Sequence, residues 1–145
     1  MQTRRIHEVA GQATWVMVLE TGDEAIDCLT RFAGEAGLDA ASFTAIGAFE
    51  RATLAFFDWE LKEYLPIPVE EQVEVASLSG DIALGPDGQP AVHVHAVLGR
   101  RDGSALAGHL KAGVVRPTLE LVLTESPGAL RKRVDAESGV ALIRM

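Results

Sequence analysis

Cysteine is almost absent from this sequence, since Cys28 is the only one among 145 residues. A single cysteine excludes an internal disulfide and fits a reducing compartment, so we expect a cytoplasmic protein. The sequence also lacks a charged-then-apolar signal peptide, and no apolar run approaches the roughly 20 residues that a membrane-spanning helix needs. We therefore expect no membrane partner.

Positive charge is also scarce. Lys and Arg number 13 against 21 Asp and Glu, which gives a formal net charge of −8. Such a chain repels a phosphate backbone, so binding of nucleic acid would need a local basic patch. No aromatics are interleaved with the basic residues and no helix–turn–helix pattern is present, so we do not expect the chain to bind nucleic acid by itself. We interpret three short basic clusters as solvated ends and turns: Arg4–Arg5, Arg100–Arg101 and Arg131–Arg133.

Repeats, low-complexity linkers and alternating strand–helix units are missing, which argues against a doubly wound parallel sheet. The length suits one domain with one core, and we expect residues 1–145 to form it. The predicted fold is α+β, with a mostly antiparallel sheet and one main N-terminal helix packed on it. β-prone runs predict strands at 13–20, 42–49, 52–59, 71–84 (a strand pair or one bent strand), 91–99, 104–113, 118–125 and 140–145.

The helix follows the first of these strands. Asp23 is its predicted N-cap, and Gly37 is predicted to be the C′ residue, just beyond its C-terminus. Apolar residues recur between them at helical spacing, and Cys28 is interpreted as a packing residue. Three further segments have local signals: Gly47 indicates a bulge or a close backbone approach, Pro66 and Pro68 break the chain after residue 59, and residues 126–139 are expected to hold a helical turn.

Three of the four histidines gather between residues 91 and 109. His93 and His95 alternate with apolar residues of a predicted strand, so they project from one face about 7 Å apart. A hairpin with a three-residue loop at 101–103 places His109 opposite His95 on that face. A two-residue loop would place His109 on the wrong face, unless a bulge at Gly108 restored the alignment. His7 lies outside this group and is expected to be exposed.

Three neutral imidazoles suit a divalent metal ion, zinc first, with nickel, copper and iron as alternatives. Three protein ligands leave an open position for water, whose pKa the ion would lower to about 7, or for a small ligand. Glu74 and Glu120 are the candidate catalytic carboxylates, with solvent-facing strand residues as the alternative interpretation. The corresponding alternative for the histidines is a set of partly buried, hydrogen-bonded structural side chains.

Five segments of the chain resemble the plants-and-prokaryotes-conserved (PPC) domain in its stand-alone prokaryotic form: "LETGDEAIDCLTRFAGEAGL", "IGAFERATLAFFD", "VEVASLSGDIAL", "DGQPAVHVHAVLGRRDGSALAGHL" and "PTLEL". The resemblance implies a largely antiparallel sheet and a homotrimer. It also implies a metal site at His93, His95 and His109, because prokaryotic members share the H-x-H…G-H pattern. Plant members carry R-G-R-P AT-hooks that bind DNA, and this sequence has none.

The predicted function is therefore a trimeric metal-binding domain, with zinc as the first choice of ion and catalysis through a metal-bound water left open. One alternative is a DNA-associated transcriptional regulator. The other is a protein- or ligand-interaction module with structural histidines. For that module the aromatic-rich segment 56–68 would line a pocket or an interface, although we favour core packing for it.

Overall fold

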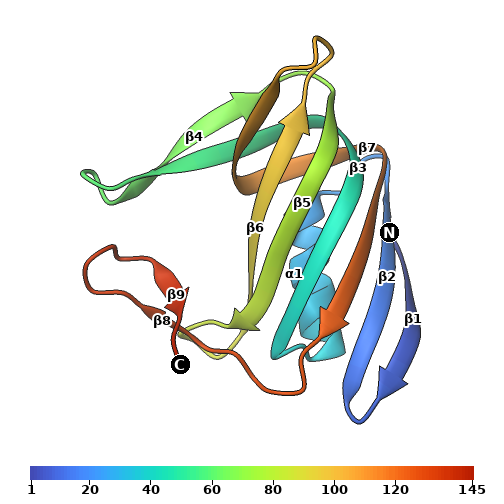
Figure 1. The fold of residues 1–145 in the computed structure, drawn as a ribbon, viewed down its shortest axis with the longest axis vertical. Helices are drawn as coiled ribbons and strands as arrows, with labels where there is room; N and C mark the ends of the chain where they lie inside the picture. The colour runs from blue at the N-terminus through green and yellow to red at the C-terminus, as the bar shows by residue number, and fades with distance from the viewer.

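Nine β-strands and one α-helix make up the fold (Figure 1), which a computed structural model describes for residues 1–145. The strands form a seven-stranded sheet and a two-stranded ribbon, with antiparallel pairing throughout. The predicted α+β fold is thereby confirmed. The elements are β1 (Gln2–Val9), β2 (Gln12–Glu20), α1 (Ala25–Ala36), β3 (Ala40–Asp58), β4 (Glu63–Val69), β5 (Val73–Leu84), β6 (Pro90–Gly99), β7 (Ala105–Glu125), β8 (Lys132–Val134) and β9 (Ala141–Ile143).

The long strands β3 and β7 form the central ladder of the sheet. The other edge of β3 pairs first with β5 and then with β4, whereas the other edge of β7 pairs with β6 and then with β2. Because β5 also pairs with β6, the strands β3, β5, β6 and β7 close a circuit. The sheet is therefore strongly curved, since β7 pairs with β6 at its start and with β2 near its end.

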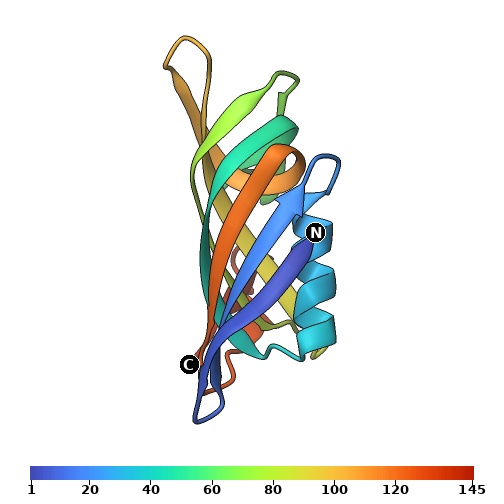
Figure 2. The same ribbon diagram turned by 90° about the vertical axis from the view of Figure 1, so that its right-hand side faces the viewer.

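Helix α1 covers only one face of the sheet (Figure 2). Its side chains Leu29, Phe32 and Ala33 are buried in the core, and Phe32 packs edge-on against Trp15 with ring centroids 5.2 Å apart. Cys28 is buried on the same side, which confirms its interpretation as a packing residue. The opposite face of the sheet, which we call the open face, carries no helix.

The start of α1 differs from the prediction by one residue. Glu24 is the N-cap, and its carboxylate accepts a hydrogen bond from the Asp27 N–H. Asp23 was the wrong choice because its carboxylate is occupied elsewhere: it accepts from the Glu20 N–H at 2.9 Å and lies 2.9 Å from the N-terminal amine of Met1. Gly37 ends the helix in a left-handed conformation, as predicted.

The four strands predicted at 42–49, 52–59, 104–113 and 118–125 are in fact two continuous strands, β3 and β7. Bulges take up the irregular residues without ending either strand, and one lies beside Gly47. A Cβ at Gly47 would collide with the Thr118 carbonyl, so the close backbone approach predicted there is confirmed. Residues 71–84 match the bent-strand alternative, because β5 is one strand with a register shift between Val75 and Ser77.

The sequence interpretation was wrong about three further segments. β1 was not predicted, and β4 forms despite Pro66 and Pro68; both strands are at the edges of the sheet, where polar residues and prolines are tolerated. The segment 126–139 was expected to hold a helical turn, and the Gly139 N–H does donate to the Asp135 carbonyl at 2.8 Å, but the strand β8 before this turn was not predicted. No helix of the structure combines the length and the apolar character that crossing a membrane requires.

Candidate metal centre

The hairpin between β6 and β7 has the three-residue loop that the sequence predicts. The Arg100 N–H donates to the Ser104 carbonyl oxygen at 2.8 Å, and Gly103 within the loop has a left-handed φ of 85°. The resulting register places His95 directly opposite His109, and no bulge interrupts this ladder. The geometric condition for bringing three histidines together is therefore met by the loop itself.

The histidines belong to the open face of the sheet. Residues directly opposite each other in antiparallel strands project to the same face. His95 is opposite Ser79, Ser79 is opposite Thr44, and Thr44 is opposite Val122. All four side chains are exposed, whereas Val94, next to His95 in sequence, projects the other way and is buried.

The three imidazoles form a compact cluster. Ring centroids are 5.1 Å apart for His93 and His95, 5.2 Å for His93 and His109, and 5.5 Å for His95 and His109. One nitrogen from each ring lies within 4.8 Å of the corresponding nitrogens of the other two. His93 and His109 are half-buried and His95 is exposed, so the cluster opens to solvent on one side.

The surroundings favour the neutral form of two of these rings. Burial, and then the positive charge of Lys111, lower the pKa of His109 to about 4. Loss of solvent around its ring, followed by the nearby His93, lowers the pKa of His95. A neutral imidazole keeps a lone pair on one nitrogen, and this is the form that binds a metal ion.

The cluster fits a divalent metal ion. His109 Nδ1 is buried and has no hydrogen-bond partner, which is costly for a polar atom unless something occupies it. Tetrahedral coordination by nitrogens at about 2.05 Å separates them by about 3.3 Å. Closing the cluster to that separation from as much as 4.8 Å requires rotation of the imidazoles, and the exposed His95 has room for it.

Two residues that the sequence interpretation missed, Asp81 and Tyr64, contact the cluster. Asp81 of β5 is opposite His93, and its Oδ2 is 3.2 Å from His93 Nδ1. Its Oδ1 forms an ion pair of 2.8 Å with Nζ of Lys132. Burial tends to raise the pKa of Asp81, but the hydrogen bond with His93 and the ion pair with Lys132 outweigh it, and the pKa is below its ordinary value.

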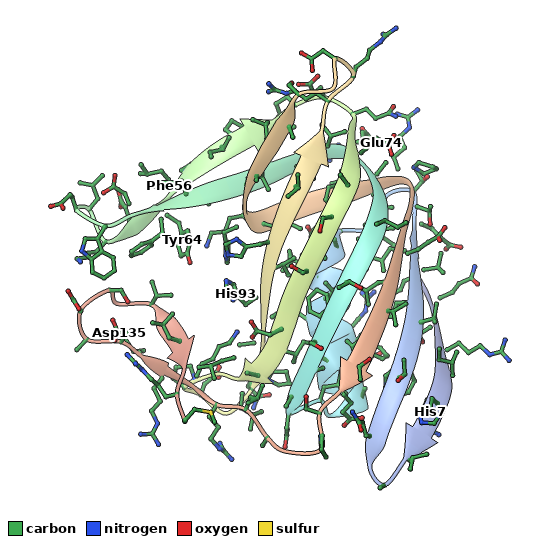
Figure 3. The ribbon with its side chains drawn as sticks, in the orientation of Figure 1. His7, Phe56, Tyr64, Glu74, His93 and Asp135 are labelled. Atoms are coloured by element: carbon green, nitrogen blue, oxygen red, sulfur yellow. The ribbon has the colours of Figure 1, made fainter.

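Tyr64 of β4 covers another side of the cluster, as Figure 3 shows. Its ring packs against that of His109 with centroids 4.7 Å apart, and Lys111 Nζ is 4.2 Å from the centroid of the Tyr64 ring. The turn "GPDGQP" was a signal for Asp81, because a hairpin around it pairs Asp81 with His93. Lys132 and Tyr64 had no such signal, since they reach the histidines through the tertiary fold.

The two candidate carboxylates are not beside the histidines within the subunit. Glu74 and Glu120 instead share a shallow pocket of the open face with Ile46 and Gly47. The pocket beside His93 and His95 is lined by Ser79, Gly80 and Asp81. Figure 3 shows Glu74 well apart from His93.

The basic clusters and the aromatic segment also differ from expectation. Lys132 is buried and paired with Asp81, so its assignment to a solvated end was wrong. Core packing is wrong for Phe56 and Trp59, which are 63% and 50% exposed on the ribbon formed by β3 and β4. That ribbon extends away from the core, and Phe57 packs edge-on against Trp59 and Tyr64 there.

Comparisons with known proteins agree with this fold. The chain is similar to a metal-containing protein from Archaeoglobus fulgidus, at 31% identity and a TM-score of 0.84, over 91% of this chain and 93% of that one. It is similar to a plant- and prokaryote-conserved (PPC) protein from Pyrococcus horikoshii, at 28% identity and a TM-score of 0.85, over 99% and 95% of the two chains. A proposed DNA-binding protein from Ralstonia eutropha is 28% identical with a TM-score of 0.85, over 97% and 95%.

No curated protein matches the sequence. A family model described as the Plants and Prokaryotes Conserved (PCC) domain matches residues 6–127, which is most of the chain. The resemblance seen in the sequence is thereby confirmed. The chain belongs to the Plants and Prokaryotes Conserved domain family.

Proposed function

We propose that this protein binds one divalent metal ion per subunit through His93, His95 and His109, with zinc as the first candidate. The observation that carries the proposal is the convergence of three imidazoles from adjacent strands, with ligand nitrogens within 4.8 Å of one another. The buried, unpartnered Nδ1 of His109 supports it, because a purely structural histidine would be expected to make a hydrogen bond. The metal-containing relative from Archaeoglobus fulgidus is in agreement.

The residues around the cluster define what it offers to a ligand. A zinc ion with three imidazole ligands would supply a Lewis acid with an open coordination position. Within the subunit, His95 is the exposed member of the cluster, whereas the Tyr64 ring packs on that of His109. A role of Glu74 or Glu120 in acid–base chemistry would require a neighbouring subunit to supply the carboxylate, because both are in a separate pocket of the same subunit.

Metal analysis of untagged protein tests the proposal. We expect about one ion per subunit in the wild type, and below about a tenth in a His93→Ala/His95→Ala double variant, because two of three ligands are removed. His7→Ala is the matched control, since His7 is an exposed histidine on β1. Less than about a tenth of an ion in folded wild type, even after zinc is added back, would contradict the proposal.

We also propose that the protein is a homotrimer whose subunits meet on the open face. Ile46 and Val122 are 63% and 47% exposed there, although large apolar side chains are more favourably covered. Light scattering on purified protein should give three times the 15.5 kDa mass of one chain. An Ile46→Thr/Val122→Thr variant should shift the mass towards that of the monomer, and a monomeric wild type would contradict the proposal.

DNA binding is the second candidate, favoured by the relative from Ralstonia eutropha. The basic side chains give it limited support, since Arg5 pairs with Glu8, Arg100 pairs with Glu71 at 2.9 Å, and Lys132 is buried. Gel-shift titration at low salt distinguishes the two functions. We expect no shift at tens of micromolar protein, whereas a shift that weakens steeply with salt would favour DNA binding.

A further inference from the structure

The C-terminal ribbon, formed by β8 and β9, is attached to the sheet next to the histidine cluster. The Leu84 N–H at the end of β5 donates to the Leu130 carbonyl at 2.8 Å, and Leu84 and Arg131 form a parallel bridge. Figure 1 shows the ribbon on the same side of the molecule as β4 and β6. Residues of this ribbon lie beyond residue 127, where the match to the family model ends.

Lys132 is the residue of the ribbon that points inward. Only 6% of its side chain is exposed, whereas Arg133, next to it, is exposed. A buried ammonium group is costly unless it is paired. Lys132 Nζ has two partners, Asp81 Oδ1 at 2.8 Å and the Ala91 carbonyl oxygen at 3.4 Å, and both belong to the strands that carry the site.

Asp81 thus has a separate partner for each carboxylate oxygen. Oδ1 pairs with Lys132 and Oδ2 contacts His93 Nδ1 at 3.2 Å. An ionised carboxylate can only accept hydrogen bonds, so His93 must donate its Nδ1–H. The remaining ring nitrogen, Nε2, then carries the lone pair that a metal ion needs, and the plane of the ring is held by the carboxylate.

We propose that Asp81 and Lys132 are positioning residues for the metal centre: Lys132 holds Asp81, and Asp81 sets the tautomer and orientation of His93. The C-terminal ribbon therefore contributes to the site without supplying a ligand. This inference rests on the proposed metal site. Because the pair acts on His93 even without metal, it can be tested separately from metal binding.

The first measurement is the tautomer of His93 in metal-free, ¹⁵N-histidine-labelled protein at neutral pH. Two-bond ¹H–¹⁵N correlation spectra should show a proton on Nδ1 in the wild type, and a mixture of tautomers or the Nε2–H form in Asp81→Ser. Lys132→Met should broaden or shift the His93 signals, because Asp81 is no longer held. Arg133→Met is the matched control and should leave them unchanged.

The second measurement is zinc affinity by competition with a chromophoric chelator. We expect Asp81→Asn to weaken binding about 10- to 100-fold, the range for residues that orient metal ligands. Lys132→Met should weaken it less, and should add little in the Asp81→Asn background, because its effect passes through Asp81. Lys132→Arg should bind zinc more tightly than Lys132→Met. Cobalt-substituted protein should show a changed absorption spectrum in Asp81→Asn, which a general loss of stability would not produce.

The two proposals fail in different ways. If the wild type binds zinc and Asp81→Asn and Lys132→Met bind it equally tightly, the positioning role is wrong and the metal site stands. If the wild type binds no metal, the metal site is wrong. In that case an unchanged His93 tautomer in Asp81→Ser would also overturn the role of Asp81. Should Asp81→Ser not fold, Lys132→Met still decides the question, because its long apolar side chain can fill the space of the lysine stem.

Discussion

The two faces of β6 differ in what surrounds them, although they consist of alternate residues of one strand. Val94, Ala96 and Leu98 are buried on the side of the sheet that α1 covers. His93 and His95 project from the open face, where the histidine cluster is accessible to solvent. Because alternate strand residues have opposite surroundings, stability and chemistry can be changed independently within a few residues.

The largest expected effect comes from the covered face. Leu98→Ala removes a side chain that is 0% exposed, so it should leave a cavity and lower the free energy of unfolding by about 3 kcal/mol. For a domain of this size the Tm should fall by roughly 10 °C. Thermal and urea unfolding measure this change. The comparison of faces requires that the folded variant still binds the wild-type amount of metal, and a loss of metal would mean that the two faces are coupled.

The second effect comes from the open face. Zinc at about 100 times its Kd should stabilise the wild type by about 2.7 kcal/mol, because the ion binds the folded state. His95→Ala should abolish this stabilisation and leave the stability of the metal-free protein almost unchanged, since His95 is exposed. Differential scanning calorimetry with and without zinc makes the comparison, and His7→Ala serves as control. A large loss of stability in metal-free His95→Ala would instead favour structural histidines.

The third effect is a dependence of stability on pH. The pKa of His109 is lowered from 6.5 to about 4 in the folded protein, by burial first and then by Lys111 and the neighbouring histidines. Between these values the unfolded state binds more protons, so stability must decrease as the pH falls through this range. We expect a loss of about 1 to 2 kcal/mol after allowance for partial solvent screening.

Urea unfolding of chelator-treated protein at several pH values between 4 and 6.5 measures this loss. His109→Asn should reduce the pH dependence without removing it, because the pKa of His95 is also lowered. Asp81 contributes only at the acidic end of this range, because its pKa is lowered from 3.8 and the unfolded state begins to bind its proton a little above that value. An equally steep dependence in His109→Asn would contradict the assignment.

The sequence predicted the hairpin of the site better than the surroundings of the site. The positions of His93, His95 and His109 follow from strand alternation and a three-residue loop, which are local properties. Predicting the contact of Asp81 with His93 required pairing β5 with β6 across the longer turn between them. Lys132 reaches Asp81 only because the C-terminal ribbon folds back on the sheet, and no local pattern of residues contains that contact.

The same distinction holds for the fold. The helix and most inner strands were predicted, because apolar periodicity reflects burial on one face. β1 and β4 were not predicted as strands because they are edge strands, where pairing on one side suffices and polar residues or prolines are tolerated. The breaks predicted within β3 and β7 were local irregularities that tertiary pairing on both sides absorbs as bulges.

The smallest expected effect is that of Val97→Thr, beside the histidines on β6. Val97 is 37% exposed, so replacing one methyl group with a hydroxyl should change the free energy of unfolding by less than about 0.5 kcal/mol. Val94→Thr, three residues earlier and 1% exposed, is the matched substitution on the covered face and should cost more, because its hydroxyl would be buried. Urea unfolding of both variants tests the comparison directly. If Val97→Thr proved as costly as Val94→Thr and also reduced the mass in solution, the subunit interface proposed around Ile46 and Val122 would extend to Val97.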